Sequence, residues 1–189
     1  MPAISTQLDE FVPVYQFHEY YSVRIAAPAE DVYRAVKTVT ADEISLFRTL
    51  TWLRRFGRPG PASILNAPLH QPVIEVALET SFLLLAEQAN REIVVGTVVI
   101  TPSSWCRGRV KTPEAFKALD HPGFAVAAMN FLIEAADAGM CKLSTETRIH
   151  ATDAGAKLRF GVYWTLIYPG SAFIRWMWLR AIARRARGM

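Results

Sequence analysis

Residues 129–166, MNFLIEAADAGMCKLSTETRIHATDAGAKLRFGVYWTL, carry the clearest structural pattern in the chain. Turn-forming residues at Asp137–Gly139 and at Asp153–Ala156 divide this stretch into three segments. Threonine, valine, isoleucine and aromatic residues, which favour strands, recur in the segments. The stretch therefore predicts three consecutive antiparallel strands joined by two turns.

The two turns also predict how the three strands pair. Folding about the first turn gives the pairs Met129–Thr147, Phe131–Thr145, Ile133–Leu143 and Glu134–Lys142, of which the last joins opposite charges. Folding about the second turn gives the pairs Leu143–Leu166, Thr145–Trp164, Thr147–Val162 and Ile149–Phe160. Both turns place the same residues of the middle strand on one mostly apolar face, and this agreement supports the predicted sheet.

The N-terminal half predicts a strand followed by two helices. Apolar and polar residues alternate over Tyr15–Ile25, which indicates a first strand. Pro28 opens a helix whose apolar residues recur at helical spacing. A second helix is expected over Asp42–Phe56, followed by a loop rich in proline and glycine.

The middle of the chain and its end predict the remaining elements. Val73–Glu79 fits a short helix, and Phe82–Gln88 with Glu92–Ile100 fits a hairpin. Pro169 and Gly170 are expected to end the last strand, with a final helix beginning after them. The apolar face of that helix is Ile174, Met177, Trp178, Ala181 and Ile182.

Length and composition fit one α+β domain over residues 1–189, with residues 1–14 irregular. The chain is 51% hydrophobic and 20% charged, which is typical of a globular protein. Cys106 and Cys141 are expected to be free thiols. We find neither a signal peptide nor an uninterrupted apolar span, so we expect a cytoplasmic location.

The order of these elements resembles the SRPBCC superfamily, which includes START-related lipid-transfer domains, Bet v 1-like proteins and polyketide cyclase/dehydrase-like proteins. The resemblance is carried by the segments APAEDVYRAV, NREIVVG, HPGFAVAAMNFLIEA, LSTETRIHATDAGAK and FIRWMWLRAIARRA. It is closest to a bacterial branch of the superfamily. It implies a helix-grip fold, in which a curved antiparallel sheet wraps on a long C-terminal helix, two short helices follow strand one, and an apolar cavity lies between sheet and helix. It implies no catalytic residue, because these differ between branches.

The predicted inner face supplies candidate ligand-binding residues. They are Tyr21 of the first strand, Met177 of the final helix, and Met129, Phe131, Thr145, Thr147, Val162 and Trp164 of the three paired strands. Apolar walls with a few hydroxyl groups are typical of ligand cavities. The same residues would also serve a filled core, and the sequence leaves both interpretations open.

Ionisable residues give weaker indications. Glu19 shares the parity of the inward residues of the first strand, and an inward carboxylate would be a candidate acid or base. We favour the interpretation that Glu19 lies at an exposed strand end. The four histidines are isolated in sequence, and no cofactor motif is present, so we expect neither a metal nor a cofactor.

The C-terminal segment is strongly basic. No acidic residue follows Asp153, while seven lysines and arginines do. Arg180, Arg184, Arg185 and Arg187 beside Trp176 and Trp178 suggest a transient contact with an anionic membrane surface, although a solvated helix end is the favoured interpretation. No second basic patch is evident, so we expect no nucleic-acid partner.

Together these features predict a protein that binds or transports a hydrophobic small molecule, such as a lipid, an isoprenoid or a polyketide-like compound. The alternative is a cyclase or dehydratase that uses the same cavity, with Glu19 or a tyrosine as acid or base. The sequence identifies neither the ligand nor the oligomeric state.

Overall fold

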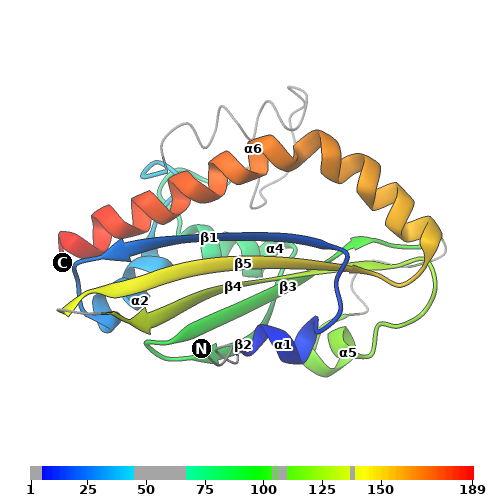
Figure 1. Cartoon of the computed structure of the whole chain (residues 1–189), viewed down its shortest axis with the longest axis horizontal. Helices are drawn as coiled ribbons and strands as arrows, with labels where there is room; N and C mark the ends of the chain where they lie inside the picture. The colour runs from blue at the N-terminus through cyan, green and yellow to red at the C-terminus, as the bar shows by residue number, and fades with distance from the viewer. Residues whose placement is uncertain (1–5, 45–66, 104, 106–109, 137–138) are drawn as a thin grey trace.

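The computed structural model describes residues 6–44, 67–103, 105, 110–136 and 139–189. Helix α6 crosses one face of a five-stranded antiparallel sheet whose order is β1-β5-β4-β3-β2 (Figure 1). The elements are α1 (Leu8–Phe11), β1 (Phe17–Ile25), α2 (Ala29–Thr38), α4 (Val73–Thr80), β2 (Leu83–Gln88), β3 (Glu92–Ile100), α5 (Pro113–Lys117), β4 (Ala125–Ala135), β5 (Cys141–Ala151) and α6 (Ala154–Arg187). The chain is thus an α+β domain of helix-grip architecture, as the sequence predicts.

The hairpin of β4 and β5 has the predicted register. Met129 pairs with Thr147 and Phe131 with Thr145. Lys142 also donates to Glu134 at 3.0 Å across the two strands. The hairpin of β2 and β3 is confirmed as well, and its strands pair from Gln88 with Glu92 onward.

The prediction of a third strand after the turn at Asp153–Ala156 is wrong. Residues from Ala154 onward form helix α6, and the neighbour of β5 on its other side is β1, which pairs Glu19 with Thr147 and Tyr21 with Thr145. Asp153 explains the start of the helix, because its carboxylate accepts a hydrogen bond from the N–H of Ala156 at 2.8 Å and caps the first turn.

Pro169 and Gly170 do not end an element either. They lie inside α6, which continues through them to Arg187. Proline in a helix removes one backbone hydrogen bond and favours a bend. In Figure 1 the helix forms an arch, and its two halves run in different directions on either side of a bend. This bend matters for the site, because the first half arches over the sheet.

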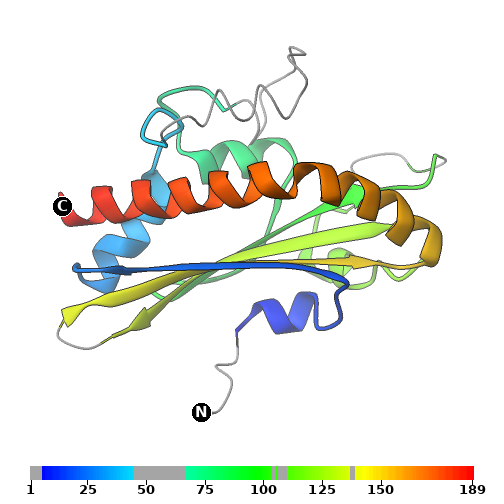
Figure 2. The same ribbon diagram turned by 45° about the horizontal axis from the view of Figure 1, so that its top comes forward.

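Two further helices lie on the same side of the sheet as α6 (Figure 2). Helix α2 confirms the helix opened by Pro28, and α4 confirms the short helix predicted at Val73. Of the second predicted helix, Asp42–Phe56, the structure describes only residues 42–44, which form turns. The rest of that prediction lies outside the described residues.

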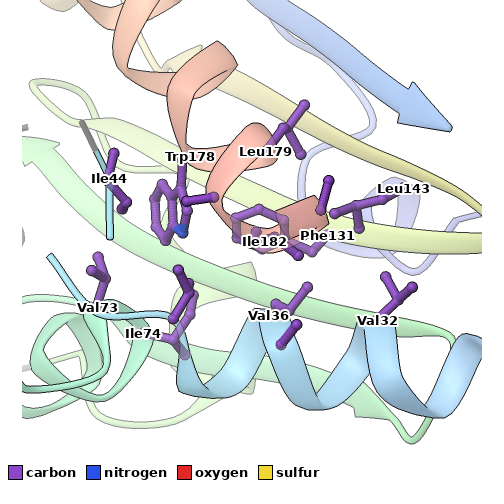
Figure 3. Packing of buried hydrophobic residues seen from close by; sticks show 14 of the residues in the cluster. Val32, Val36, Ile44, Val73, Ile74, Phe131, Leu143, Trp178, Leu179 and Ile182 are labelled. Atoms are coloured by element: carbon purple, nitrogen blue, oxygen red, sulfur yellow. The ribbon is translucent and has the colours of Figure 1, made fainter. Parts of the chain in front are cut away.

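The main core fills the space between α2, α4, the second half of α6 and the sheet. Phe131 of β4 packs edge-on against Trp178 of α6, with ring centroids 5.1 Å apart. Figure 3 shows these two rings among aliphatic side chains from α2, such as Val32 and Val36, and from the end of α6. The interior at this end of the sheet is therefore closely filled.

The opposite face of the sheet carries the N-terminal segment. The sequence predicts residues 1–14 to be irregular, yet Leu8–Phe11 form α1 and pack there together with α5. Glu92, which is 1% exposed, accepts hydrogen bonds from Thr6 Oγ1 at 2.9 Å and from Asn130 Nδ2 at 2.7 Å. Arg148 adds a charged contact to Asp9 at 2.6 Å. A buried polar cluster thus holds the segment on the sheet.

Candidate ligand cavity

A cavity of about 270 Å³ lies between the middle of α6 and the sheet. Its walls come from β1, β3, β4, β5 and α6, together with the turn before β2. Three lining residues, Ser81, Val99 and Tyr163, are exposed, so the cavity reaches the surface on this side. The volume is close to the lower end of the range for ligand pockets, roughly 300 to 1,000 Å³.

Aromatic rings form the wall on the helix side. Phe160 and Trp164 line the cavity, and Tyr168 continues their row at the same interval of four residues, so the three share one face of α6. Their ring centroids lie 5.7 and 5.5 Å apart in succession. Phe17 of β1 meets Phe160 edge-on, with ring centroids 5.0 Å apart, and so joins this wall to the edge strand. The wall is aromatic and mostly apolar, which suits an apolar ligand.

A polar group of residues lies at the other end of the cavity. Glu19 of β1 is only 3% exposed, and its carboxylate accepts a hydrogen bond from Ser171 Oγ of α6 at 3.5 Å. Arg175, one turn further along α6, donates to Thr145 Oγ1 at 3.4 Å and toward the sulfur of Met129. The cavity therefore combines an aromatic wall with one carboxyl and one guanidinium side chain.

Tyr21 lies beside this polar group. Burial, a hydrogen bond with Tyr168 and the negative charge of Glu19 raise the pKa of Tyr21 above its usual range, while Arg175 acts in the opposite direction. The hydroxyl of Tyr21 is therefore protonated at neutral pH. It is suited to donate a hydrogen bond and not to act as a base.

The eight residues predicted to bind a ligand lie in different parts of the structure, and only some of them line the cavity. Met129, Thr147 and Trp164 line the cavity. Phe131 is packed against Trp178 in the core, and Thr145 is buried next to Arg175. Tyr21 borders the polar end, as described above, and Met177 lies in a separate hollow near the end of α6.

The prediction that Val162 lines the ligand cavity is wrong. It is 69% exposed on the outer side of α6 and lines no part of the cavity. The prediction assumes strand geometry, in which Val162 and Trp164 point the same way. In a helix, residues two positions apart point in different directions, so Trp164 turns toward the sheet and Val162 away from it.

The interpretation of Glu19 as an exposed strand end is wrong, since its side chain is buried in the cavity. In the sequence, the inward position of Glu19 is indicated only by its spacing of two residues from Tyr21, and of two more from Val23, which places all three on one face of the strand. Sequence reasoning also misses Ser171 and Arg175 as site residues, because they fit a helix cap and a basic tail. Their spacing of four residues places both on one face of α6, and this is the signal that could have found them.

Other reactive side chains lie away from the cavity. His18 contacts Glu146 at 3.0 Å and His150 contacts Gln16 at 3.3 Å, both on the far face of the sheet. Burial raises the pKa of the Cys141 thiol, while Cys106 lies outside the described residues. Within the part of the chain that the structure describes, no group of three histidine, cysteine or acidic side chains gathers in metal-binding geometry.

No protein-family model and no curated protein sequence matches the chain. Among solved structures, TTHA0849 from Thermus thermophilus is 10% identical, with 91% of this chain and 98% of that chain covered and a TM-score of 0.37. The hypothetical protein jhp0584 from Helicobacter pylori is 10% identical, with 99% and 98% covered and a TM-score of 0.40. CalU16 from Micromonospora echinospora is 13% identical, with 90% and 84% covered and a TM-score of 0.29.

Similarities this weak carry no information about ligand or activity. The class of the protein rests on its own element order, sheet topology and cavity. These define an α+β helix-grip domain with an internal space between sheet and C-terminal helix.

Proposed function

We propose that this protein binds or carries a compact hydrophobic molecule that has a polar group at one end. The observation that supports this most is the juxtaposition of the aromatic wall of α6 with Glu19, Ser171 and Arg175 at the far end of the cavity. The resemblance of the sequence to the SRPBCC superfamily favours the same kind of function. The volume of about 270 Å³ favours an isoprenoid or polyketide-like ring compound over a two-chain lipid.

The energetics of such a complex follow from the cavity walls. Apolar burial would contribute roughly 25 cal/mol per Å² before the cost of association is subtracted. A ligand hydroxyl or carbonyl at the polar end would exchange hydrogen bonds with Ser171 or Arg175, which would orient it. Affinity would therefore come from the aromatic wall and orientation from the polar end.

Native mass spectrometry of freshly purified protein, followed by solvent extraction, tests the proposal directly. An apolar compound that co-purifies with the protein would support a carrier and would name the ligand class. The matched variants are Ala127→Trp, which fills the cavity from β4, and Val162→Trp, which adds the same ring on the exposed side of α6. We expect Ala127→Trp to lose the compound and Val162→Trp to keep it. Equal retention by both variants would contradict the assignment of this cavity.

A second candidate function is a cyclase or dehydratase. It is favoured by one observation, the buried carboxylate of Glu19 inside the cavity. A carboxylate held in an apolar site is a common general acid or base. In this case a polyketide-like substrate incubated with the protein would lose water, as followed by mass spectrometry. Glu19→Gln would abolish that loss while ligand retention stays, whereas unchanged turnover in Glu19→Gln would exclude Glu19 as the reacting group.

A further inference from the structure

Helix α6 presents an exposed stripe along almost its whole length, on its solvent-facing side. The stripe consists of Leu158, Val162, Leu166, Phe173, Trp176, Arg180, Arg184 and Arg187. The first and last of these residues are 29 positions apart, which is about eight turns at roughly 3.6 residues per turn. One face of the helix therefore runs from five apolar side chains to three arginines.

The apolar part of the stripe is largely open to solvent, and the ring contacts of Phe173 and Trp176 stay within the stripe. Leu158, Val162 and Leu166 are 71%, 69% and 65% exposed, and Trp176 is 46% exposed. The opposite face of the same helix, with Phe160, Ile174 and Trp178, already supplies the cavity wall and the core. Single exposed apolar residues are ordinary, but a continuous line of them along one helix marks an interaction surface.

The basic part of the stripe specifies the charge of the partner. Arg180 stacks its guanidinium over the ring of Trp176, 4.3 Å from the centroid. Arg180, Arg184 and Arg187 line a hollow of about 410 Å³ together with Val23, Trp176, Met177 and Ala183. No acidic residue lies on α6, so the surface attracts anions. The partner must be negatively charged at one end of the stripe and apolar along the rest.

The structure also corrects which residues of the basic tail are available. Trp178 is buried against Phe131, and Arg185 is held by Glu43 at 2.8 Å and by Thr38 at 2.9 Å. Both are candidates for membrane contact in the sequence, and neither belongs to the exposed stripe. Leu158, Val162, Leu166 and Phe173 take their place.

We propose that the stripe docks α6 on the surface of a membrane that contains anionic lipids. The helix would lie in the plane of the interface, with the apolar side chains at the boundary of headgroups and acyl chains and the arginines on lipid phosphates. Nucleic acid would use the arginines but would leave Leu158, Val162 and Leu166 uncovered. None of the described helices is both long and apolar enough to cross a bilayer. This inference rests on the surface of α6 and does not depend on the cavity.

Co-sedimentation of the full chain with vesicles tests the docking. We expect strong binding to vesicles of phosphatidylcholine mixed with phosphatidylglycerol, weak binding to phosphatidylcholine alone, and a loss of binding as salt is raised. Each arginine at such a surface contributes about a factor of five, so Arg180→Ala with Arg187→Ala should weaken binding roughly thirty-fold. Leu166→Ser should weaken it about ten-fold on the anionic vesicles. Arg184 is left unchanged because it also donates to the Glu43 carbonyl at 2.8 Å.

The matched control is the double variant Arg34→Ala with Arg91→Ala, which removes the same charge from exposed sites outside α6. It should bind like the natural protein. Circular dichroism of each variant would show that the fold is kept. Three results would overturn the proposal: no sedimentation with either vesicle, equal weakening by the control pair, or a dimer in solution that Leu166→Ser dissociates while vesicle binding is absent. The last result would assign the stripe to a second copy of the chain.

Discussion

Ser171 on α6 donates a hydrogen bond to the carboxylate of Glu19 on β1, across 152 positions of sequence and at 3.5 Å. This contact joins the edge strand of the sheet to the middle of the last helix, just beyond Pro169. It also places a carboxyl group at the polar end of the cavity, together with Arg175. The same contact therefore helps to hold α6 on β1 and positions the carboxyl group of Glu19 in the cavity.

Removing that hydroxyl should be measurable. Ser171→Ala takes one donor away from a buried carboxylate, and we expect the free energy of unfolding to fall by about 1 kcal/mol. Urea denaturation measures the change. Thr165→Ala is the control, because Thr165 is exposed on the same helix and donates to the backbone carbonyl of Gly161. A Ser171→Ala protein as stable as the natural one would show that the contact contributes nothing.

Phe131 and Val162 provide a second test, because the sequence predicts the same inward position for both. Phe131 is buried against Trp178, so Phe131→Ala should cost roughly 3 to 5 kcal/mol of unfolding free energy. Val162 is exposed, so Val162→Ala should change stability by less than about 0.5 kcal/mol. Chemical denaturation of the two variants side by side checks the difference. Similar costs would mean that α6 is not oriented as described.

The buried cluster on the far face predicts a large effect of Glu92. Its carboxylate accepts hydrogen bonds from Thr6, Gln7 and Asn130. Glu92→Leu therefore leaves these donors without their acceptor. We expect a loss of about 3 kcal/mol in urea denaturation. Glu30→Leu removes a carboxylate that is 73% exposed and should cost less than about 1 kcal/mol. If both variants show an equally small decrease in unfolding free energy, the N-terminal segment is not held by this cluster.

Asp153 predicts a pH dependence of stability. Backbone hydrogen bonds from Ala156 and Gly123 lower the pKa of its carboxyl below the ordinary value of 3.8. The folded state therefore favours the ionised form, so the contribution is complete above the ordinary pKa and is lost as the pH falls through the lowered value. The natural protein should exceed Asp153→Asn in unfolding free energy at neutral pH, and the gap should narrow in acid. A gap that is independent of pH would contradict the capping role of the carboxylate.

The hairpin of β4 and β5 is predictable because its information is local. Turn residues and two-residue alternation specify both the strands and their register within a short stretch, and the opposite charges of Glu134 and Lys142 agree with it. The helix over residues 154–187 is not predictable in the same way. Phe160, Val162 and Trp164 fit an alternating strand, but Phe160, Trp164, Ile167 and Ser171 fit one face of a helix equally well.

The sequence by itself thus determined the α+β class, the first strand, helix α2, both hairpins of the sheet and the basic end of the chain. Only the tertiary structure decided that β1, and not a later strand, pairs with β5, and that α6 runs unbroken through Pro169. That pairing turns Glu19 inward, and the long helix brings Ser171 and Arg175 to meet it. The physical reason is that local pattern depends on neighbours in sequence, whereas the environment of a charged side chain depends on which distant element covers it.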